Sequence, residues 1–258
     1  MLFGSSGIPN STSPRSTEMG IAQISKLGLD AMELAFVHSV NIREEKTLGV
    51  KKTSKRFDVV LSCHGQYYIN LNSPEPEKVE ASIERVLKAA RIANLCGAVS
   101  LIFHPGFYMK GDPKEVYSQI KDRIVEIVDT LESESNPIWI RPETTGKMAQ
   151  FGTLGEILDL STEIEQVIPC IDFSHIYARS LGKINTYEAF REVLEEVEAS
   201  LGKEGIRNLH VHLSGIEYGK RGEVKHLNLE DSDINYSHIL SAFIDFDADG
   251  IIICESPK

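Results

Sequence analysis

Eight side chains of the metal-binding type lie at, or just beyond, the ends of apolar segments of the sequence. They are His64, His104, Glu143, Asp172, His175, His212, His226 and Glu255. Imidazole and carboxylate groups together are typical ligands of zinc, manganese or iron. A carboxylate that directly follows an apolar strand is costly to bury unless it is paired or binds a metal. Because eight groups exceed the needs of one four-coordinate ion, the pattern predicts a site for two or three metal ions.

Three other histidines fall outside this pattern. His38 and His238 do not follow apolar segments, so we expect structural or surface roles for them. His210 precedes His212 by two residues and shares its strand face, which predicts a position deeper inside the fold. There it would either pack or support a neighbouring metal ligand.

The apolar segments themselves predict the elements that position these groups. Eight strands are expected at 2–4, 31–36, 58–63, 99–104, 138–143, 167–172, 208–213 and 250–255. Helical periodicity falls between them, near 17–27, 43–55, 76–96, 113–133, 153–164, 186–201 and 236–245. This alternation predicts a single (β/α)8 TIM-barrel domain over residues 1–258 whose final helix is absent. Active sites of such barrels lie at the carboxyl ends of the strands, so the eight groups should converge on one rim.

Composition limits the class of protein. Of 258 residues, 27 are Lys or Arg and 38 are Asp or Glu, and the resulting net charge of −11 argues against a simple nucleic-acid binder. The four cysteines lack C-x-x-C spacing, which argues against a disulfide framework. The sequence shows no membrane-length apolar run and no signal-peptide core. We therefore expect a reduced, cytoplasmic protein with no membrane association and no obligate protein partner.

Several short motifs carry a family resemblance. They are C-H-G-Q-Y-Y-I-N-L from Cys63, H-P-G from His104, P-E-T-T-G from Pro142, I-D-F-S-H from Ile171, H-L-S-G from His212, K-H-L-N from Lys225 and E-S-P from Glu255. In order and spacing, the chain from about residue 58 to residue 257 resembles the endonuclease IV family of apurinic/apyrimidinic (AP) endonucleases. That family belongs to the xylose isomerase-like barrel superfamily.

The resemblance implies a zinc site of two or three ions, with manganese as another possible metal. His64, His104 and Glu143 would hold the first ion. Glu143 would bridge to a second ion held by Asp172, His212 and Glu255, and His175 and His226 would hold a third. Glu143 would also be catalytic, and Tyr67 and Asn70 would contact the substrate. The implied partner is double-stranded DNA containing abasic sites, cleaved 5′ to the lesion to leave a 3′-hydroxyl and a 5′ deoxyribose phosphate.

The chain departs from the family pattern at the third ion. The family has a carboxylate two residues before the last histidine, and this chain has Val224 there. Glu223 is the first candidate to replace it, and Asp231 and Asp233 are the others. The N-terminal region shows no clear match either, although it carries DNA-contacting loops in the family.

The acidic total does not exclude a basic face around the site. Basic residues expected in loops at that face are Lys110, Lys147, Arg179, Lys183, Lys220, Arg221 and Lys225. Aromatic residues that follow strand ends are Tyr67, Tyr68, Phe107, Tyr108, Phe151 and Tyr177. The basic residues would contact phosphates, and the aromatic residues would stack in the gap left by a missing base. Alternatively, the basic residues serve only solubility and the aromatic residues pack at the barrel rim.

Two other functions stay open. A divalent-metal sugar isomerase or epimerase on the same barrel would need fewer ligands, usually two carboxylates with one or two histidines. A noncatalytic metal- or nucleic-acid-binding module would need no reactive centre. Metal content separates the three hypotheses, because about three ions favour the nuclease and about one favours the isomerase.

Overall fold

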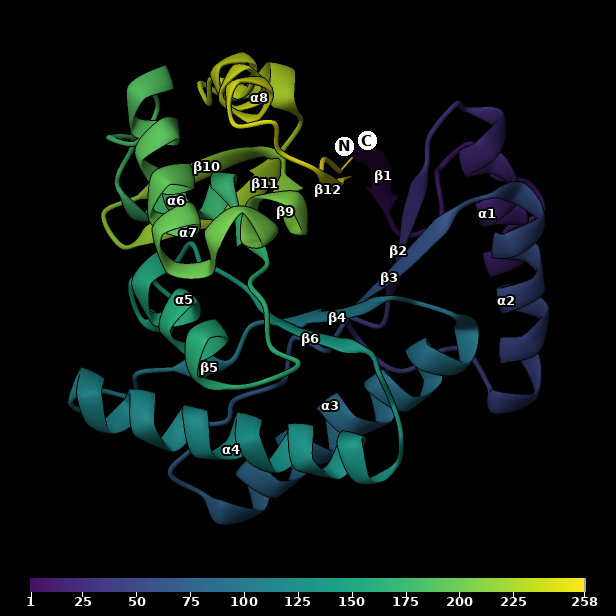
Figure 1. Cartoon of the computed structure of the whole chain (residues 1–258), viewed down its shortest axis with the longest axis horizontal. Helices are drawn as coiled ribbons and strands as arrows, with labels where there is room; N and C mark the ends of the chain where they lie inside the picture. The colour runs from purple at the N-terminus through teal and green to yellow at the C-terminus, as the bar shows by residue number, and fades with distance from the viewer. Residues whose placement is uncertain (258) are drawn as a thin grey trace.

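A computed structural model of the chain describes residues 1–257 and contains a barrel of eight parallel strands (Figure 1). The strands are β1 (Leu2–Ser6), β2 (Ala31–Ala35), β3 (Val60–His64), β4 (Ser100–Phe103), β6 (Trp139–Pro142), β8 (Ile171–Asp172), β9 (Leu209–Leu213) and β12 (Gly250–Cys254). Their hydrogen-bonded order is β6-β4-β3-β2-β1-β12-β9-β8. Isolated parallel bridges Ile140–Val167 and Glu143–Cys170 join the two ends of this sheet. The predicted TIM-barrel fold is confirmed.

Seven helices connect successive strands of the barrel and surround it (Figure 1). They are α1 (Thr17–Lys26), α2 (Glu44–Phe57), α3 (Pro76–Cys96), α4 (Pro113–Ser133), α5 (Leu154–Glu163), α7 (Tyr187–Arg207) and α8 (Tyr236–Asp245). Strand β12 is the last element described in residues 1–257. Phe3 on β1 is 45% exposed.

Four features of the structure differ from the sequence prediction. The segment expected as a strand at 167–172 is a strand only at its end, because Pro169 has no N–H to donate and interrupts the ladder. A short helix α6 (Phe173–Arg179) follows β8, where we expected a loop. Helix α7 extends to Arg207 through a non-helical Gly202. The segment expected as a loop around His226 is a β-hairpin, β10 (Gly215–Gly219) and β11 (Gly222–Leu227), followed by a 3-10 turn at Leu229–Asp231.

A second small sheet forms part of the same rim. Strand β5 (Gly106–Phe107) pairs antiparallel with β7 (Gln150–Phe151), which joins the loop after β4 to the loop after β6. The capping box of Thr153 and Glu156 then starts α5 directly beyond β7. The loops that carry His104 and Glu143 are therefore held together by backbone hydrogen bonds.

The apolar core lies between the strands and the surrounding helices, whereas the barrel interior is unusually polar. The largest buried cluster joins side chains of α1 to α5 to the outer faces of the strands. Inside the barrel, Ala31, Ile251 and Ile253 form a small buried apolar cluster. Glu33, Ser62, Ser100, Arg141, His210 and His212 are also buried there. Branched apolar side chains fill most TIM barrels, so this interior must satisfy its polar groups internally.

Arg141 on β6 hydrogen-bonds to polar groups at the lower end of this interior. Its guanidinium donates to Ser100 Oγ (2.9 Å), to the Pro169 carbonyl (2.8 Å) and to the Asn208 side chain (2.9 Å). These contacts join β4, the segment before β8 and the start of β9. Arg141 thus closes the floor of the barrel beneath the strand ends.

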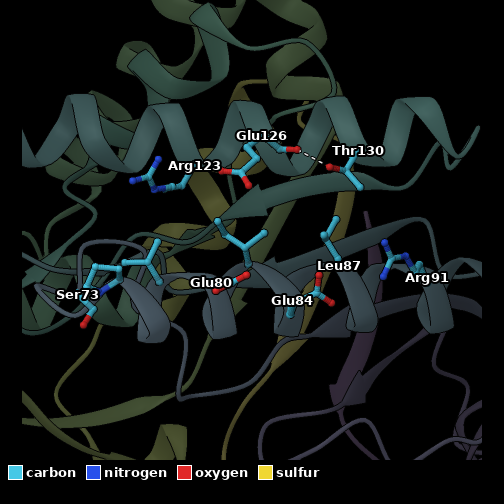
Figure 2. A pocket seen from close by; sticks show the side chains of 11 residues that line it. Ser73, Glu80, Glu84, Leu87, Arg91, Arg123, Glu126 and Thr130 are labelled. Atoms are coloured by element: carbon cyan, nitrogen blue, oxygen red, sulfur yellow. Dashed lines mark hydrogen bonds between the residues drawn. The ribbon is translucent and has the colours of Figure 1, made fainter.

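Charged side chains line a groove in the outer helical wall. A groove between α3 and α4 is lined by Glu80, Glu84 and Arg91 of α3 and by Arg123 and Glu126 of α4 (Figure 2). It contains neither histidine nor cysteine. None of the helices described in residues 1–257 combines the length and the hydropathy that crossing a lipid bilayer requires.

Replacing Arg141 by Met is expected to lower the free energy of unfolding by about 3 kcal/mol or more, because it leaves several buried acceptors without a donor. Arg191→Met is the matched control, since Arg191 pairs with Glu195 at the surface of α7 and its loss should cost at most about 1 kcal/mol. Urea denaturation of both variants measures the difference. An equal loss of unfolding free energy in the two variants would show that the buried hydrogen bonds of Arg141 do not stabilise the barrel.

Candidate metal centre

The eight predicted ligands converge on the rim formed by the strand ends. His64 ends β3, Asp172 ends β8 and His212 lies one residue before the end of β9. His104, Glu143 and Glu255 directly follow β4, β6 and β12. His175 lies on α6 and His226 on β11 of the hairpin. All eight take part in overlapping groups of three or four side chains whose ligand atoms lie within 4.8 Å of one another.

Glu143 lies at the centre of the site, and its two carboxylate oxygens face different partners. Oε2 lies 3.2 Å from His64 Nε2 and 3.5 Å from His104 Nε2. Oε1 lies 3.1 Å from His212 Nδ1. Glu143 itself has no exposed surface. Each oxygen of Glu143 thus faces a different set of imidazole nitrogens.

The second group consists of Glu143, Asp172, His212 and Glu255. Asp172 Oδ1 accepts the backbone N–H of His175 (2.8 Å) and so caps the start of α6. Its other oxygen, Oδ2, is buried without a hydrogen-bond partner in the described part of the chain. Glu255 Oε2 lies 3.7 Å from His212 Nδ1. The Nδ1 atom of His175 lies 3.3 Å from Asp172 Oδ2. A buried carboxylate oxygen without an aligned hydrogen bond is stabilised by a cation.

The third group joins Asp172 to His175 on α6 and His226 on the hairpin, and Glu223 lies beside it. His175 Nδ1 donates to the Thr144 carbonyl (3.0 Å), which leaves Nε2 as the nitrogen available to a metal. That Nε2 lies 3.3 Å from His226 Nε2. Glu223 Oε2 lies 3.6 Å from the same His175 nitrogen. Glu223 is thus the acidic side chain at the position where the family carboxylate is missing.

A β-bulge explains how Glu223 reaches this position. Across the hairpin Glu223 pairs with Tyr218 and Lys225 pairs with Glu217, so Val224 has no partner and is 55% exposed. Residues three apart in a regular strand face opposite sides. The extra residue restores the alternation and puts Glu223 and His226 on the same side of β11.

Two glycines let the hairpin approach α6 closely enough. A Cβ at Gly146 would lie 2.7 Å from Glu223 Cβ and 3.0 Å from the His175 ring. Gly222 has a φ of +89°, and a Cβ there would contact the Gly146 backbone. Hydrogen bonds from Glu223 N to Gly146 O (3.0 Å) and from Met148 N to Arg221 O (3.1 Å) fasten the hairpin to this loop.

The donor set fits zinc. Tetrahedral zinc with ligand distances of about 2.0–2.1 Å separates neighbouring nitrogen or oxygen ligands by about 3.3 Å. Six pairs of candidate ligand atoms lie 3.1–3.7 Å apart, and all atoms of each group lie within 4.8 Å of one another. A backbone carbonyl also fixes the tautomer of His64, whose Nδ1 contacts Gly65 O at 2.8 Å and leaves Nε2 toward Glu143. The residues therefore fit a cluster of two or three ions.

Burial and mutual charge shift the pKa values of the site strongly. Burial opposes the charged form of His64, yet the hydrogen bond and charge of Glu143 outweigh it and raise the pKa to about 9. Burial also opposes the charged form of His175, but the negative charges of Asp172 and Glu143 outweigh it and raise the pKa of His175 to about 10. At His104 burial prevails over Glu143 and lowers the pKa to about 3. Burial raises the pKa of Asp172 to about 6.

The two predicted substrate-binding residues lie in different surroundings. Tyr67 is 57% exposed, and its ring contacts the rings of His64 and His38 edge to face. It therefore lies beside the first metal-binding group and faces solvent. Asn70 Oδ1 accepts the backbone N–H groups of Phe107 (3.2 Å) and Asn72 (3.2 Å), so this oxygen holds the β5 loop in place.

The basic rim is smaller than the sequence predicts. The Arg179 guanidinium donates to Thr145 Oγ1 (2.9 Å) and to the carbonyls of Lys147 (2.8 Å) and Gln150 (3.0 Å), so it fastens a loop. Lys147 lies 3.9 Å from Glu223, and Lys225 pairs with Glu217 at 3.2 Å. Four of the seven predicted basic residues take part in none of these hydrogen bonds or ion pairs: Lys110, Lys183, Lys220 and Arg221.

Sequence reasoning missed Glu33, which lies beneath the site on β2. It is fully buried, and His210 Nε2 and Ser62 Oγ contact its Oε2 at 3.1 and 2.9 Å. His210 is therefore a buried polar neighbour of the site, within the range of roles expected for it. The signal in the sequence was a lone carboxylate inside the apolar run A-M-E-L-A-F.

The metal-free protein is expected to lose stability as the pH rises from about 6.5 to about 8.5. Unfolded histidines have a pKa of about 6.5 and release their protons in this window, whereas folded His64 and His175, with pKa values of about 9 and 10, keep theirs. The stabilisation is complete below the unfolded pKa and is lost as the pH approaches the folded values. Each group contributes at most about 1.4 kcal/mol per pH unit.

Urea denaturation of chelator-treated protein at several pH values measures this slope. His64→Gln should make the slope shallower, because one of the retained protons is removed. A stability that rises with pH, or a variant with an unchanged slope, would show that these imidazoles are not held in the charged form.

A family model described as a xylose isomerase-like TIM barrel matches residues 21–258. The chain is 48% identical to an uncharacterized protein, MJ0133, of Methanocaldococcus jannaschii over 257 residues, covering 100% of this chain and 92% of that protein. It is 27% identical to an apurinic-apyrimidinic endonuclease of Caenorhabditis elegans over 215 residues, 81% of this chain and 53% of the relative. The chain thus spans about half the length of that endonuclease.

Solved structures of two kinds share the fold. Endonuclease IV from Thermus thermophilus superposes with a TM-score of 0.78 at 19% identity, covering 100% of this chain and 93% of that chain. A D-tagatose 3-epimerase-like protein superposes with a TM-score of 0.76 at 20% identity, covering 99% and 91%. At these identities the likeness is one of fold. The family match, over nearly the whole sequence, shows that the chain belongs to the xylose isomerase-like TIM barrel family.

Proposed function

We propose that this protein is a metal-dependent phosphodiesterase of the endonuclease IV type that cleaves DNA on the 5′ side of an abasic site. The observation that carries the proposal is the position of Glu143, whose two oxygens face two separate sets of donors. A one-ion enzyme has no need of the additional pair of histidines, His64 and His104. The third group, His175 with His226 and Glu223, adds a further set of donors.

Zinc or manganese ions bound here would supply a water of lowered pKa and would neutralise the charge that grows on the phosphate oxygens. Glu143 would fix the spacing of the first two positions. The Asp172 cap on α6 would fix the third group relative to the second, because the same carboxylate contacts the His175 backbone. The loop carbonyls beside His64 and His175 hold their tautomers, which keeps the ligand nitrogens facing inward.

The rim around these groups offers surfaces for an abasic nucleotide. Tyr67 and Tyr68 are 57% and 61% exposed directly after the first ligand, and aromatic side chains stack well on unpaired bases and exposed sugars. Lys110, Lys183, Lys220 and Arg221 supply positive charge on an otherwise acidic body. Binding through so few phosphate contacts should be weak at high salt.

A sugar epimerase is the second candidate, and one specific observation favours it. Glu143, Asp172, His212 and Glu255 form a complete four-ligand group on their own. Such a group could hold the single divalent ion that polarises a hydroxyketone. The likeness to the D-tagatose 3-epimerase-like protein supports the same function. On this account His64 and His104 would bind the sugar rather than a metal.

Incision of a duplex oligonucleotide that carries one abasic analogue tests the proposal. We expect cleavage on the 5′ side of the lesion, loss of cleavage with a chelator and recovery with zinc or manganese. Glu143→Gln should lower the rate by at least about 100-fold, because the amide cannot bridge two cations. Glu126→Gln is the matched control: it makes the same change on the outer wall (Figure 2) and should leave the rate unchanged.

Cleavage that survives the chelator, or a Glu143→Gln variant as active as the parent, would contradict the mechanism. If the metal-loaded protein leaves the lesion uncut and interconverts ketose epimers, the second candidate is correct.

Replacing Glu223 by Ala should lower the metal content by about one ion per chain, because a carboxylate beside His175 is then lost from the third position. Glu217→Ala removes a carboxylate from the same hairpin, where it pairs with Lys225, and should leave the metal content unchanged. Elemental analysis of the purified variants measures both. An unchanged metal content in Glu223→Ala would show that Glu223 is not a ligand of the third ion.

A further inference from the structure

The buried carboxylate of Glu33 has no role in the metal groups described above, yet it contacts one of their ligands. Oε1 lies 3.1 Å from Nε2 of His212, and both residues are fully buried. The other nitrogen of the same ring, Nδ1, faces Glu143 at 3.1 Å and Glu255 at 3.7 Å. His212 therefore lies between a carboxylate beneath the site and the carboxylates of the second group.

The geometry of this contact is incomplete. Glu33 Oε1 and His212 Nε2 are buried, and neither has an aligned hydrogen bond within residues 1–257. Glu33 Oε2, in contrast, is fully engaged by Ser62 Oγ (2.9 Å) and His210 Nε2 (3.1 Å). Two adjacent polar atoms left unpaired in a protein interior are costly, so a state that joins them is favoured.

We propose that Glu33 is the positioning residue of His212: it accepts the Nε2–H of this ring and thereby directs Nδ1 to the metal of the second group. An imidazole carries one proton when neutral, and a metal requires the unprotonated nitrogen. An acceptor at Nε2 selects the tautomer whose Nδ1 is free. The buried negative charge of Glu33 also strengthens His212 as a donor to a cation.

The surrounding residues are arranged to hold this carboxylate in place. Ser62 on β3 and His210 on β9 bind Oε2 from two sides, which leaves Oε1 toward His212. Glu33 and its partners occupy three different barrel strands, and none of them reaches solvent. The polar barrel interior is in this way continuous with the metal centre above it.

The inference rests on the proposed metal centre, and zinc affinity tests both separately. Competition with a chromophoric zinc chelator is expected to show wild-type protein binding two to three ions, and Glu33→Gln binding one of them about 10- to 100-fold more weakly. Glu126→Gln makes the same chemical change in the outer groove between α3 and α4 and should change each affinity by less than about 3-fold.

Long-range 15N–1H correlation of the His212 ring in zinc-loaded wild-type protein provides a readout that does not depend on a variant. We expect the proton on Nε2 and no proton on Nδ1. A proton on Nδ1, or a Glu33→Gln variant with unchanged zinc affinities, would overturn the role of Glu33 while leaving the metal centre intact. A wild-type protein that binds no zinc would overturn both.

Discussion

The structure depends on one constraint: Glu143 is fully buried, and its charge must be balanced from both sides. Burying a carboxylate is costly unless it is paired and hydrogen-bonded. Here Oε2 faces His64 and His104, and Oε1 faces His212. Further carboxylates gather around these partners, and bound cations would balance their charge. The site is therefore best understood as a ligand set for metal ions.

Most of the candidate ligands lie at the carboxyl ends of the parallel strands, and the remaining two lie on the helix α6 and the strand β11. Strands β3, β4, β6, β8, β9 and β12 each place one candidate ligand at or directly after their carboxyl end. The third group comes instead from α6 and the β10–β11 hairpin, which approach each other only because Gly146 and Gly222 leave room. Below, buried polar groups replace part of the usual apolar filling: Glu33 contacts His210, and Arg141 donates to the Pro169 carbonyl.

The comparison of sequence with structure shows which features local patterns specify. The strand ends with His64, His104 and Glu255 were predictable because an apolar run followed by a ligand marks both the element and its end. The hairpin was not predicted, because its two strands carry charged residues at several positions and contain no continuous apolar run. Nor was the orientation of Glu33 predicted: β2 is buried on both faces, so alternation does not reveal which side faces the interior. The engagement of Arg179 by loop carbonyls is likewise a long-range contact that a list of basic residues cannot reveal.

The position of bound metal tests the central claim most directly. Crystals of zinc-loaded protein, measured at the zinc absorption edge, should show anomalous peaks at three places: between His64, His104 and Glu143; between Glu143, Asp172, His212 and Glu255; and between His175, His226 and Glu223. A pair of peaks that shares Glu143 would establish the bridging carboxylate. A single peak, held by Asp172, His212, Glu255 and Glu143 with His64 and His104 unligated, would contradict the multinuclear centre and favour a one-metal sugar epimerase.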